Sequence, residues 1–406
     1  MTHRFARLRR FHFNLPQRIA AGLLAIFLIQ GFWLISRQDL SDSDYQYARC
    51  GREIWEKPSP IAGYFTTCGN IHDGILAYRA AGLPLTLNLL AQRGLDLFRK
   101  PEDRVVQIAG HAGADLSIWE LRHQLTHVSL LLRLPFLFAG FILGGALWWV
   151  TRRLYGNFGG YTALALYCFS PAILKASVTP NPEILAALGL YGGVYTCIGV
   201  AHAMQGPRRK WRPRILLLTP IFGVVAASHI AALPIVAVLG LVFMYWIAEG
   251  RCAQILPIVL MAVGGALLLL FAFYNFSPDA FSYVFRSAAG FVSFSLDPAK
   301  RFFTELGNAG ITIGAAAAAL LYLALRRSRY FGNTAPLLCF LALFAIVTTG
   351  VHSTPWLWAL PFLLTFIAGV LADAYDSPRR KLALAAGGAI VALQAAFCLL
   401  SLPGLL

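Results

Sequence analysis

The chain has 406 residues, of which 58% are hydrophobic and only 13% charged, and its mean hydropathy is +0.64. A chain this apolar does not fold as a soluble globular protein, so the composition predicts a polytopic membrane protein. The formal net charge of +16 comes from basic residues that stand between apolar runs. We interpret it as a topology signal, and we expect no nucleic-acid partner.

Apolar runs with the length and composition of membrane-spanning helices follow one another along the chain. There are eleven of them, at 18–36, 130–150, 159–177, 183–204, 215–231, 233–248, 254–275, 309–325, 335–350, 355–371 and 382–403. Alanine and glycine are frequent in these runs, which suits close helix packing in lipid. We expect an all-α fold in which residues 1–406 form a single integral membrane domain. Its transmembrane bundle covers 130–403, and a large outside loop covers 37–128.

Basic residues alternate between the ends of these runs. The clusters lie near Arg4–Arg10, at Arg152–Arg153, Arg208–Arg214, Arg326–Arg329 and Arg379–Lys381. Short cytoplasmic loops retain such clusters, so we expect a multi-pass protein of the inner (plasma) membrane with its N-terminus in the cytoplasm and its C-terminus outside. The basic clusters would also contact anionic membrane lipid. Of the 18 acidic residues, 15 fall on the outside in this topology, eleven of them between Asp39 and Glu120.

The outside loop contains apolar periodicity and is predicted to be ordered. A segment from Gly74 to Phe98, interrupted at Pro84, has the pattern of an amphipathic helix lying in the membrane interface, and Leu116–Leu132 is a second one. These helices either cover the bundle or wall a cavity at the outer leaflet. Cys50 and Cys68 share the loop, and in an oxidising compartment they could form a disulfide bond.

One pattern in the loop suits a metal ion. His123 and His127 stand four residues apart, on one face of a helix, with Glu120 nearby. This spacing is typical of zinc ligands. Membrane metalloproteases need a glutamate after the first histidine, where this chain has Gln124, so hydrolysis is not expected. The remaining interpretations are a divalent ion that assists another reaction, or a helix that meets lipid headgroups.

Four short motifs and their placement resemble a known family. They are Leu131-Leu132-Arg133-Leu134-Pro135, Arg152-Arg153-Leu154-Tyr155-Gly156, Phe169-Ser170-Pro171 and Thr179-Pro180-Asn181-Pro182-Glu183. Over about residues 15–250 the chain resembles the GT-C class of membrane glycosyltransferases, of the protein O-mannosyltransferase and aminoarabinose transferase type. The resemblance implies transfer of a sugar from a polyprenyl-phosphate donor to a lipid, glycan or protein acceptor at the outer face. It gives no indication of the oligomeric state.

In that family an acidic residue just after the first helix acts as a base on the acceptor or as a metal ligand. The corresponding stretch here is Asp39-Leu40-Ser41-Asp42-Ser43-Asp44. The resemblance makes Asp44 the first candidate for the catalytic base and Asp42 the second. A carboxylate at the membrane surface can accept the proton of an attacking hydroxyl group. A solvated end of the first helix is the other explanation of these acids.

The departing lipid phosphate requires a cation, and Arg matches phosphate oxygens best. Arg286 is the first candidate, followed by Lys300 and Arg301, while Arg133 is well placed to face the loop. Side chains that anchor helices in the interface would look the same. His229 and His352 lie at outside helix ends, where a polar group is a candidate site residue by default. They could equally be packing histidines.

The chain also departs from the family pattern. Tyr45 follows Asp44 where an acid is common, Ile71-His72-Asp73-Gly74 replaces a His-Pro-Pro element, and Asn181 stands where Asp is frequent. Either catalysis has decayed, or its roles have moved to other polar groups such as Asp73 and Glu183, with His72 and Asn181 in support. The alternatives to an enzyme are a non-catalytic membrane scaffold and a transporter of lipid or solute.

Overall fold

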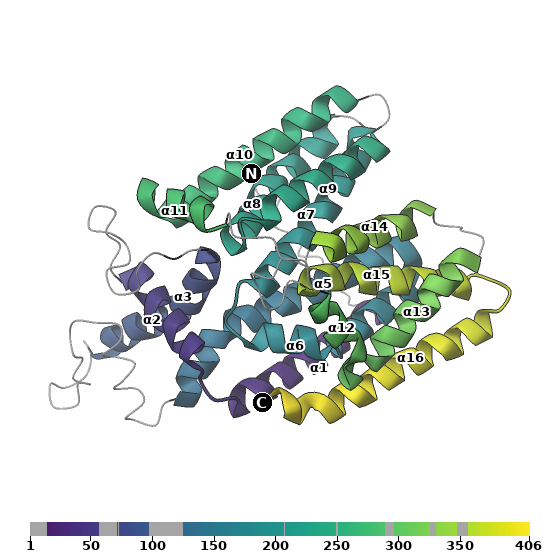
Figure 1. Ribbon diagram of the computed structural model, residues 1–406, viewed down its shortest axis with the longest axis horizontal. Helices are drawn as coiled ribbons and strands as arrows, with labels where there is room; N and C mark the ends of the chain where they lie inside the picture. The colour runs from purple at the N-terminus through teal and green to yellow at the C-terminus, as the bar shows by residue number, and fades with distance from the viewer. Residues whose placement is uncertain are drawn as a thin grey trace, which may run out of the picture.

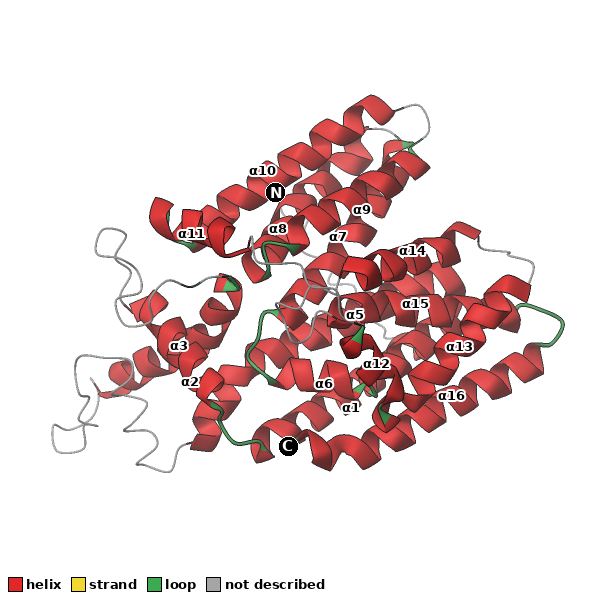
Figure 2. Ribbon diagram, viewed as in Figure 1, coloured by secondary structure: helices red, strands yellow, loops and turns green. Residues whose placement is uncertain are grey.

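The computed structural model describes residues 14–56, 71, 73–96, 125–206, 208–248, 251–288, 296–324, 330–346 and 356–406. Within these ranges the chain forms helices and no strand (Figure 2). Among the described helices, seven are long and apolar enough to cross a membrane, and shorter apolar helices accompany them. The protein is therefore an all-α polytopic membrane protein, as its composition predicts.

Each predicted apolar run overlaps a helix. The helices are α1 (Leu15–Arg37), α2 (Asp42–Glu56), α3 (Ile75–Asp96), α5 (Leu125–Cys168), α6 (Pro171–Val178), α7 (Glu183–Met204), α8 (Arg208–Ser228), α9 (Ala232–Ile247), α10 (Ile255–Phe273), α11 (Pro278–Ala288), α12 (Asp297–Thr304), α13 (Ala309–Ala324), α14 (Tyr330–Ile346), α15 (Trp356–Tyr375) and α16 (Arg380–Ser401). The second and third runs share α5, which kinks at Gly156 (φ +78°). A left-handed φ of this kind suits glycine, so two spans follow each other there without a loop.

The third predicted span, 159–177, is not continuous. Its helix ends at Cys168, and α6 begins at Pro171, which has no N–H group to donate to the preceding turn. Two carbonyls at this break are bonded by side chains of distant helices: Gln30 Nε2 donates to Cys168 O (3.3 Å), and Gln394 Nε2 donates to Phe169 O (2.7 Å). The prediction of one uninterrupted helix was wrong because Pro171 breaks it and two glutamines stabilise the break.

Helices α2 and α3 cross at two glycines. A Cβ atom on Gly51 would lie 2.7 Å from Gly82 N and would also overlap Tyr78 O, and one on Gly82 would overlap the backbone of Gly51. The two backbones are therefore in direct contact, which only glycine permits. α3 continues through Pro84, so the predicted interruption there was wrong. One lost backbone hydrogen bond does not outweigh the packing of this helix.

The helices form groups that are visible in Figure 1. α8, α9, α10 and α11 lie on one side of the molecule, and α13, α16 and α1 lie on the other, with α5, α7 and α15 between them. α15 is the most enclosed of the candidate spans. The α2–α3 pair stands apart from the bundle axis and packs against both α5 and α8. It therefore joins α8, on one side of the molecule, to the central helix α5.

Candidate functional site

Four polar side chains from segments far apart in the sequence meet beside the α2–α3 pair. Asp73 directly precedes α3, and Glu183 is the first residue of α7. His229 lies between α8 and α9, and Trp358 lies in the first turn of α15. All four belong to chain segments that the charge pattern places on the outside. The fold thus gathers outer helix ends into one cluster.

Asp73 holds this cluster together. Its Oδ1 accepts hydrogen bonds from Gly74 N (2.8 Å) and from Ile230 N (3.1 Å), and its Oδ2 lies 3.2 Å from His229 Nδ1. Gly74 adopts φ +76°, and a Cβ atom there would lie 3.1 Å from the ring of Pro182. Three turns of the chain therefore touch at this point.

Burial changes the chemistry of the Asp73 carboxyl group. Desolvation raises the pKa of Asp73 from the usual 3.8 to about 7, although the N–H groups of Gly74 and Ile230 favour the ionised form and lower it. A carboxyl group with a pKa near neutrality can exchange a proton at physiological pH. Such a shift is typical of functional sites, although ion networks with a structural role also produce it.

Glu183 is the second carboxyl group of the cluster. Its side chain is only 4% exposed, and its Oε2 has no hydrogen-bond partner among the described residues. Asn181 Oδ1 accepts a hydrogen bond from Glu183 N (2.6 Å), which fixes the first turn of α7. The His229 ring packs edge-on against Trp358, with ring centroids 4.9 Å apart. Trp358 Nε1, itself buried and without a hydrogen-bond partner among the described residues, is a donor close to the Glu183 carboxyl group.

Asp44 is the third carboxyl group and lies in the first turn of α2. Its Oδ2 accepts hydrogen bonds from Arg133 Nη2 (2.7 Å) and from Ser41 N (2.9 Å), and the Ser41 hydroxyl accepts one from Asp44 N (3.3 Å). This reciprocal pair is a capping box. In the described part of the chain, Asp44 Oδ1 has no hydrogen-bond partner, and the residue is 2% exposed. The carboxylate is therefore oriented, with one oxygen open.

Arg133 is 1% exposed and connects three segments. Its Nη1 donates to Gln38 O (2.9 Å) and to Ser129 Oγ (2.9 Å), and its Nη2 donates to Asp39 O (2.8 Å) besides Asp44. The guanidinium group thus ties the end of α1 and the start of α2 to α5. The sequence placed it near the loop, and the structure shows it paired with the candidate base.

Tyr47 lies on α2, one turn after Asp44. Burial raises the pKa of its hydroxyl group well above the usual value, and electrostatic repulsion from nearby acidic groups raises it further. These groups are the Tyr78 hydroxyl and the carboxyl groups of Glu183, Asp73 and Asp44. The Tyr47 ring stacks on Tyr78 with centroids 4.3 Å apart. All three carboxyl groups act electrostatically on Tyr47. We therefore treat Asp44, Asp73 and Glu183, with Tyr47, as one candidate site and call it the carboxyl site.

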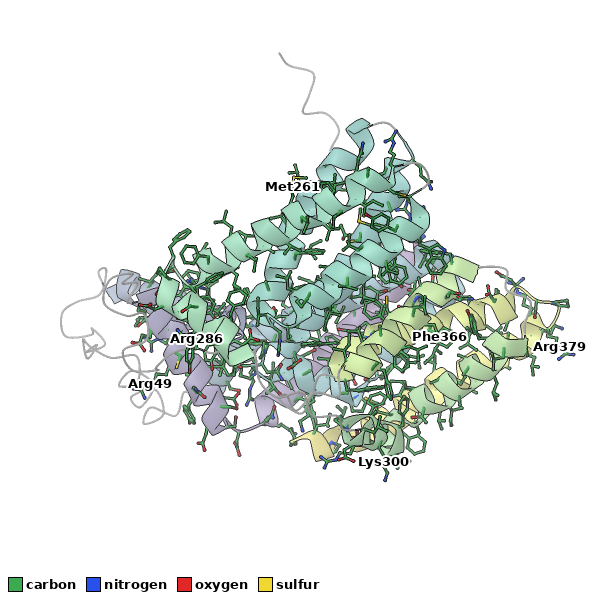
Figure 3. The ribbon with its side chains drawn as sticks, turned by 45° about the horizontal axis from the view of Figure 1, so that its top comes forward. Arg49, Met261, Arg286, Lys300, Phe366 and Arg379 are labelled. Atoms are coloured by element: carbon green, nitrogen blue, oxygen red, sulfur yellow. The ribbon has the colours of Figure 1, made fainter. Side chains whose placement is uncertain are left out.

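The other predicted cations lie elsewhere. Arg286 is exposed on α11 and donates to Ser282 Oγ (3.0 Å). Lys300 and Arg301 are exposed on α12. Figure 3 shows Arg286 and Lys300 on separate parts of the surface. The structure therefore brings together Asp44, Arg133, Asp73, Asn181, Glu183 and His229, and it leaves these three cations at the periphery.

The remaining predicted residues lie outside this cluster or outside the described residues. Asp42 is exposed at the start of α2, so it is not part of the carboxyl site. Cys50 is disulfide-bonded. Among the described residues, no group of three or more His, Cys, Asp or Glu side chains is arranged to bind a metal ion. His72, His123, Glu120, His352 and Cys68 lie outside the described residues, as does the side chain of His127.

Two residues of the cluster were not among the predicted ones. Tyr47 follows Asp44 by three residues, so both lie on one face of α2. Trp358 lies just after an expected outside turn, and the N–H group of a buried tryptophan normally needs a hydrogen-bond acceptor nearby. A helical reading of the segment after Asp42 would have found Tyr47, whereas Trp358 required the fold.

Comparisons with known proteins agree with this architecture. No protein-family model and no curated protein matches the sequence. Two solved structures match the fold. One is ArnT, an aminoarabinose transferase, from Cupriavidus metallidurans in the apo state, with a TM-score of 0.60 and 14% identity over 92% of this chain. The other is the Archaeoglobus fulgidus oligosaccharyltransferase, in complex with Zn and sulfate, with a TM-score of 0.52 and 13% identity over 94% of this chain.

Both of these proteins are GT-C glycosyltransferases, so the chain has the GT-C fold. The likeness extends over nearly the whole chain, well beyond the stretch that carries the sequence motifs. The chain spans 62% of the length of ArnT and 52% of that of the oligosaccharyltransferase. At these identities the comparison establishes the fold, and the chemistry must be argued from the site.

Proposed function

We propose that the protein transfers a glycosyl group from a polyprenyl-phosphate-linked donor to an acceptor hydroxyl group at the outer membrane face. The observation that carries the proposal is the carboxyl site, where two buried carboxyl groups keep an open oxygen in a protein with the GT-C fold. A buried acceptor without a partner costs about 1–3 kcal/mol. A substrate whose hydroxyl groups donate hydrogen bonds to Asp44 Oδ1 and Glu183 Oε2 would explain why the protein keeps both atoms without a partner in the part of the chain that the structure describes.

Asp44 serves as the base. The acceptor O–H group donates to Asp44 Oδ1, its oxygen attacks the anomeric carbon, and the carboxylate takes the proton. The bond between that carbon and the phosphate oxygen breaks, and its electron pair leaves with the lipid phosphate. Arg133 and Ser41 hold the other oxygen of Asp44, which fixes the direction of the open one. Attack opposite the leaving group inverts the anomeric centre.

Glu183 and Asp73 contact the sugar or the acceptor. The open oxygen of Glu183 can accept a hydrogen bond from a sugar hydroxyl group. The departing phosphate needs a cation, and Arg286 remains the first candidate because its guanidinium group is exposed near the outer end of α10. Lys300 and Arg301 are the next candidates. Both Nη groups of Arg133 are engaged with the protein, one of them with Asp44, whereas its Nε has no hydrogen-bond partner among the described residues. We therefore propose that Arg133 orients the base.

The proposed orientation places the N-terminus in the cytoplasm and the C-terminus outside the plasma membrane. Two observations support it. The disulfide-bonded Cys50 lies on α2, in the segment expected outside, and disulfides persist in oxidising compartments. At the other end of the bundle, Arg379, Arg380 and Lys381 are exposed, as expected for a cytoplasmic loop.

The test is transfer of labelled sugar from a panel of polyprenyl-phosphate donors by the purified protein in nanodiscs. Wild type is compared with Asp44→Asn, and Asp42→Asn serves as the matched control, since Asp42 is an exposed acid on the same helix. We expect transfer by wild type and by Asp42→Asn, and none by Asp44→Asn. Equal transfer by all three would remove Asp44 as the base, and no transfer by wild type from any donor would contradict the function.

A further inference from the structure

Arg79, on α3, has no role in the chemistry described above, yet it is almost fully buried, with 8% of the residue exposed. Its Nε and Nη2 donate to Phe273 O (2.9 and 2.6 Å), and Nη2 also donates to Asn275 Oδ1 (2.6 Å). The guanidinium group lies 5.1 Å from the centroid of the Trp55 ring, whose Nε1 donates to Arg79 O (2.9 Å). One side chain therefore connects α2, α3 and the end of α10.

The end of α10 explains why an arginine is needed. Phe276 N donates to Phe271 O (2.9 Å), and Asn275 N donates to Ala272 O (2.9 Å), which is a Schellman motif. The rings of Phe271 and Phe276 are 5.4 Å apart, the apolar contact that accompanies this motif. The carbonyl oxygens of Phe271 and Ala272 thus accept hydrogen bonds from backbone N–H groups of the turn. The oxygen of Phe273 accepts its hydrogen bonds from the Arg79 side chain.

The turn also carries backbone strain. Asn275 and Phe276 both have left-handed φ values, +51° and +60°, and no other described non-glycine residue does. Asparagine tolerates this conformation, whereas an aromatic side chain rarely adopts it. Such a turn persists only where its surroundings fix it. The hydrogen bonds of Arg79 to Phe273 O and Asn275 Oδ1 fix it here, and a cation at a helix C-terminus also interacts favourably with the helix dipole.

The α2–α3 pair and the turn before α3 are held at three points. Arg133 on α5 binds Asp44 at the start of α2, Arg79 on α3 binds the end of α10, and Asp73 before α3 binds Ile230 between α8 and α9. Asp44 and Asp73 belong to this segment, whereas Glu183 belongs to α7. The geometry of the carboxyl site therefore depends on all three attachments.

We propose that Arg79 is a positioning residue of the glycosyl transfer reaction: by binding the α10–α11 turn it sets the place of Asp73 relative to Glu183 and the place of α11. The inference rests on the proposed function. Asp73 stands six residues before Arg79, and the turn at Gly74 and the first turn of α3 lie between them. A shift of α3 at Arg79 therefore acts on Asp73 through this turn. α11 starts two residues after Phe276 and carries Arg286, so the same bond orients the candidate phosphate ligand.

The experiment compares Arg79→Gln and Arg79→Lys with Arg49→Gln in nanodiscs. Arg49 is an exposed arginine on α2 (Figure 3) and serves as the matched control. The first readout is hydrogen–deuterium exchange, which needs no activity. We expect Arg79→Gln to speed exchange of the amides of residues 273–286 and 74–82, while the amides of α15 stay protected. Arg79→Lys keeps the positive charge but not the planar guanidinium group, so its exchange rates should lie between those of wild type and Arg79→Gln.

The second readout is transfer at saturating donor. We expect Arg79→Gln to lower kcat by about 10- to 100-fold, the cost of misplacing reacting groups by about 1 Å. Arg49→Gln should leave both readouts unchanged. Asn275→Gly removes one hydrogen-bond acceptor of Arg79 and relieves the backbone strain of the turn. We therefore expect the double variant Arg79→Gln/Asn275→Gly to show nearly the same exchange rates as Arg79→Gln alone.

Unchanged exchange at 273–286 in Arg79→Gln would overturn the inference, as would faster exchange with an unchanged kcat. If wild type transfers no sugar, the proposed function fails, and with it the catalytic part of the inference. The exchange data would still decide whether Arg79 fixes the turn. If Arg79→Gln does not fold, the same exchange and kcat measurements are made on Arg79→Lys and Asn275→Gly, with Arg49→Gln again as the control.

Discussion

The break between α5 and α6 and the carboxyl site are both polar clusters enclosed by apolar helices, yet they satisfy their hydrogen bonds differently. At the break, Gln394 Nε2 donates to Phe169 O (2.7 Å) and Gly307 O (2.8 Å), and its Oε1 accepts from Ile311 N (3.0 Å). The neutral amide of Gln394 is matched here to fixed backbone groups, and the polar atom at the break that is left without a partner among the described residues is a neutral hydroxyl, Ser170 Oγ. The arrangement stabilises an irregular backbone in the membrane, where no water can do so.

At the carboxyl site the matching is incomplete. Asp44 and Glu183 each keep a buried oxygen without a hydrogen-bond partner among the described residues. Burying such groups is unfavourable, and natural proteins keep few of them. Neutral amides paired with backbone therefore indicate a structural cluster, and ionisable groups with an open oxygen indicate chemistry. Each of the following predictions tests this distinction.

The largest effect is expected from the Asp44–Arg133 pair. Asp44→Asn leaves Arg133 as an uncompensated buried charge, which should cost about 3–5 kcal/mol of stability, and it should lower transfer by about 10²- to 10⁴-fold. In the double variant Asp44→Asn/Arg133→Gln the uncompensated charge is gone, so the melting temperature should recover while transfer does not. Thermal unfolding and the transfer assay measure the two. Recovery of transfer in the double variant would contradict a catalytic Asp44.

The next effect concerns pH. Since burial raises the pKa of Asp73 from 3.8 to about 7, the folded protein binds this proton more tightly than the unfolded chain does. The contribution of Asp73 to stability is therefore fully present below pH 3.8 and is lost as the pH rises through 7, by up to about 4 kcal/mol. Melting temperatures between pH 4 and 8 should fall less steeply for Asp73→Asn than for wild type. Identical slopes would show that folding does not raise the pKa of Asp73.

A smaller effect is expected at the break. Gln394→Leu leaves Phe169 O, Gly307 O and Ile311 N without their side-chain partner, and we expect a loss of about 3 kcal/mol. Gln30→Leu, which removes one long-range bond, should cost less. The kcat of the remaining folded protein should stay close to that of wild type in both variants. Loss of kcat without loss of stability would place the break in the reaction.

The smallest effect is expected at the exposed cations. Arg286→Gln should change stability by less than about 0.5 kcal/mol and should raise the KM for the lipid-phosphate donor several-fold, most clearly at low salt. Lys300→Gln, on a separate part of the surface, is the comparison. Equal effects of both variants would mean general attraction of an anionic lipid, and no effect of Arg286→Gln would exclude it as a phosphate ligand.

The hydropathy of the sequence was sufficient to locate apolar helices, because each predicted run overlaps one. It did not give their lengths: among the described helices seven are long enough to cross a membrane, and others of the eleven predicted runs correspond to shorter apolar helices. It was not sufficient to find the break, since Pro171 stands in a run that is apolar throughout, and its partners Gln30 and Gln394 come from opposite ends of the chain. The passage of α3 through Pro84 was missed for a related reason. Its cause is the glycine crossing with α2, a tertiary contact that no local pattern contains.

The candidate site was predicted in pieces. Asp44 came from the resemblance, and Asp73 and Glu183 came from the turns where the family pattern fails. Nothing local states that Asp73 bonds to Ile230, 157 residues further on. Arg79 gave a weaker signal still, because an arginine on an amphipathic helix normally faces solvent or headgroups. Its role depends on where α10 ends.

The bond between Arg79 and Phe273 also sets an order of assembly. The two residues are 194 positions apart in the chain. At a synthesis rate of about 5–20 residues per second, the partner of Arg79 emerges roughly 10–40 s after Arg79 itself. Until then the α2–α3 pair can be held at Asp44 and, once Ile230 has emerged, at Asp73. A ribosome-bound chain stalled before α10 therefore contains all three carboxyl groups of the site but lacks the partner of Arg79, so α3 acquires its last attachment only late in membrane insertion.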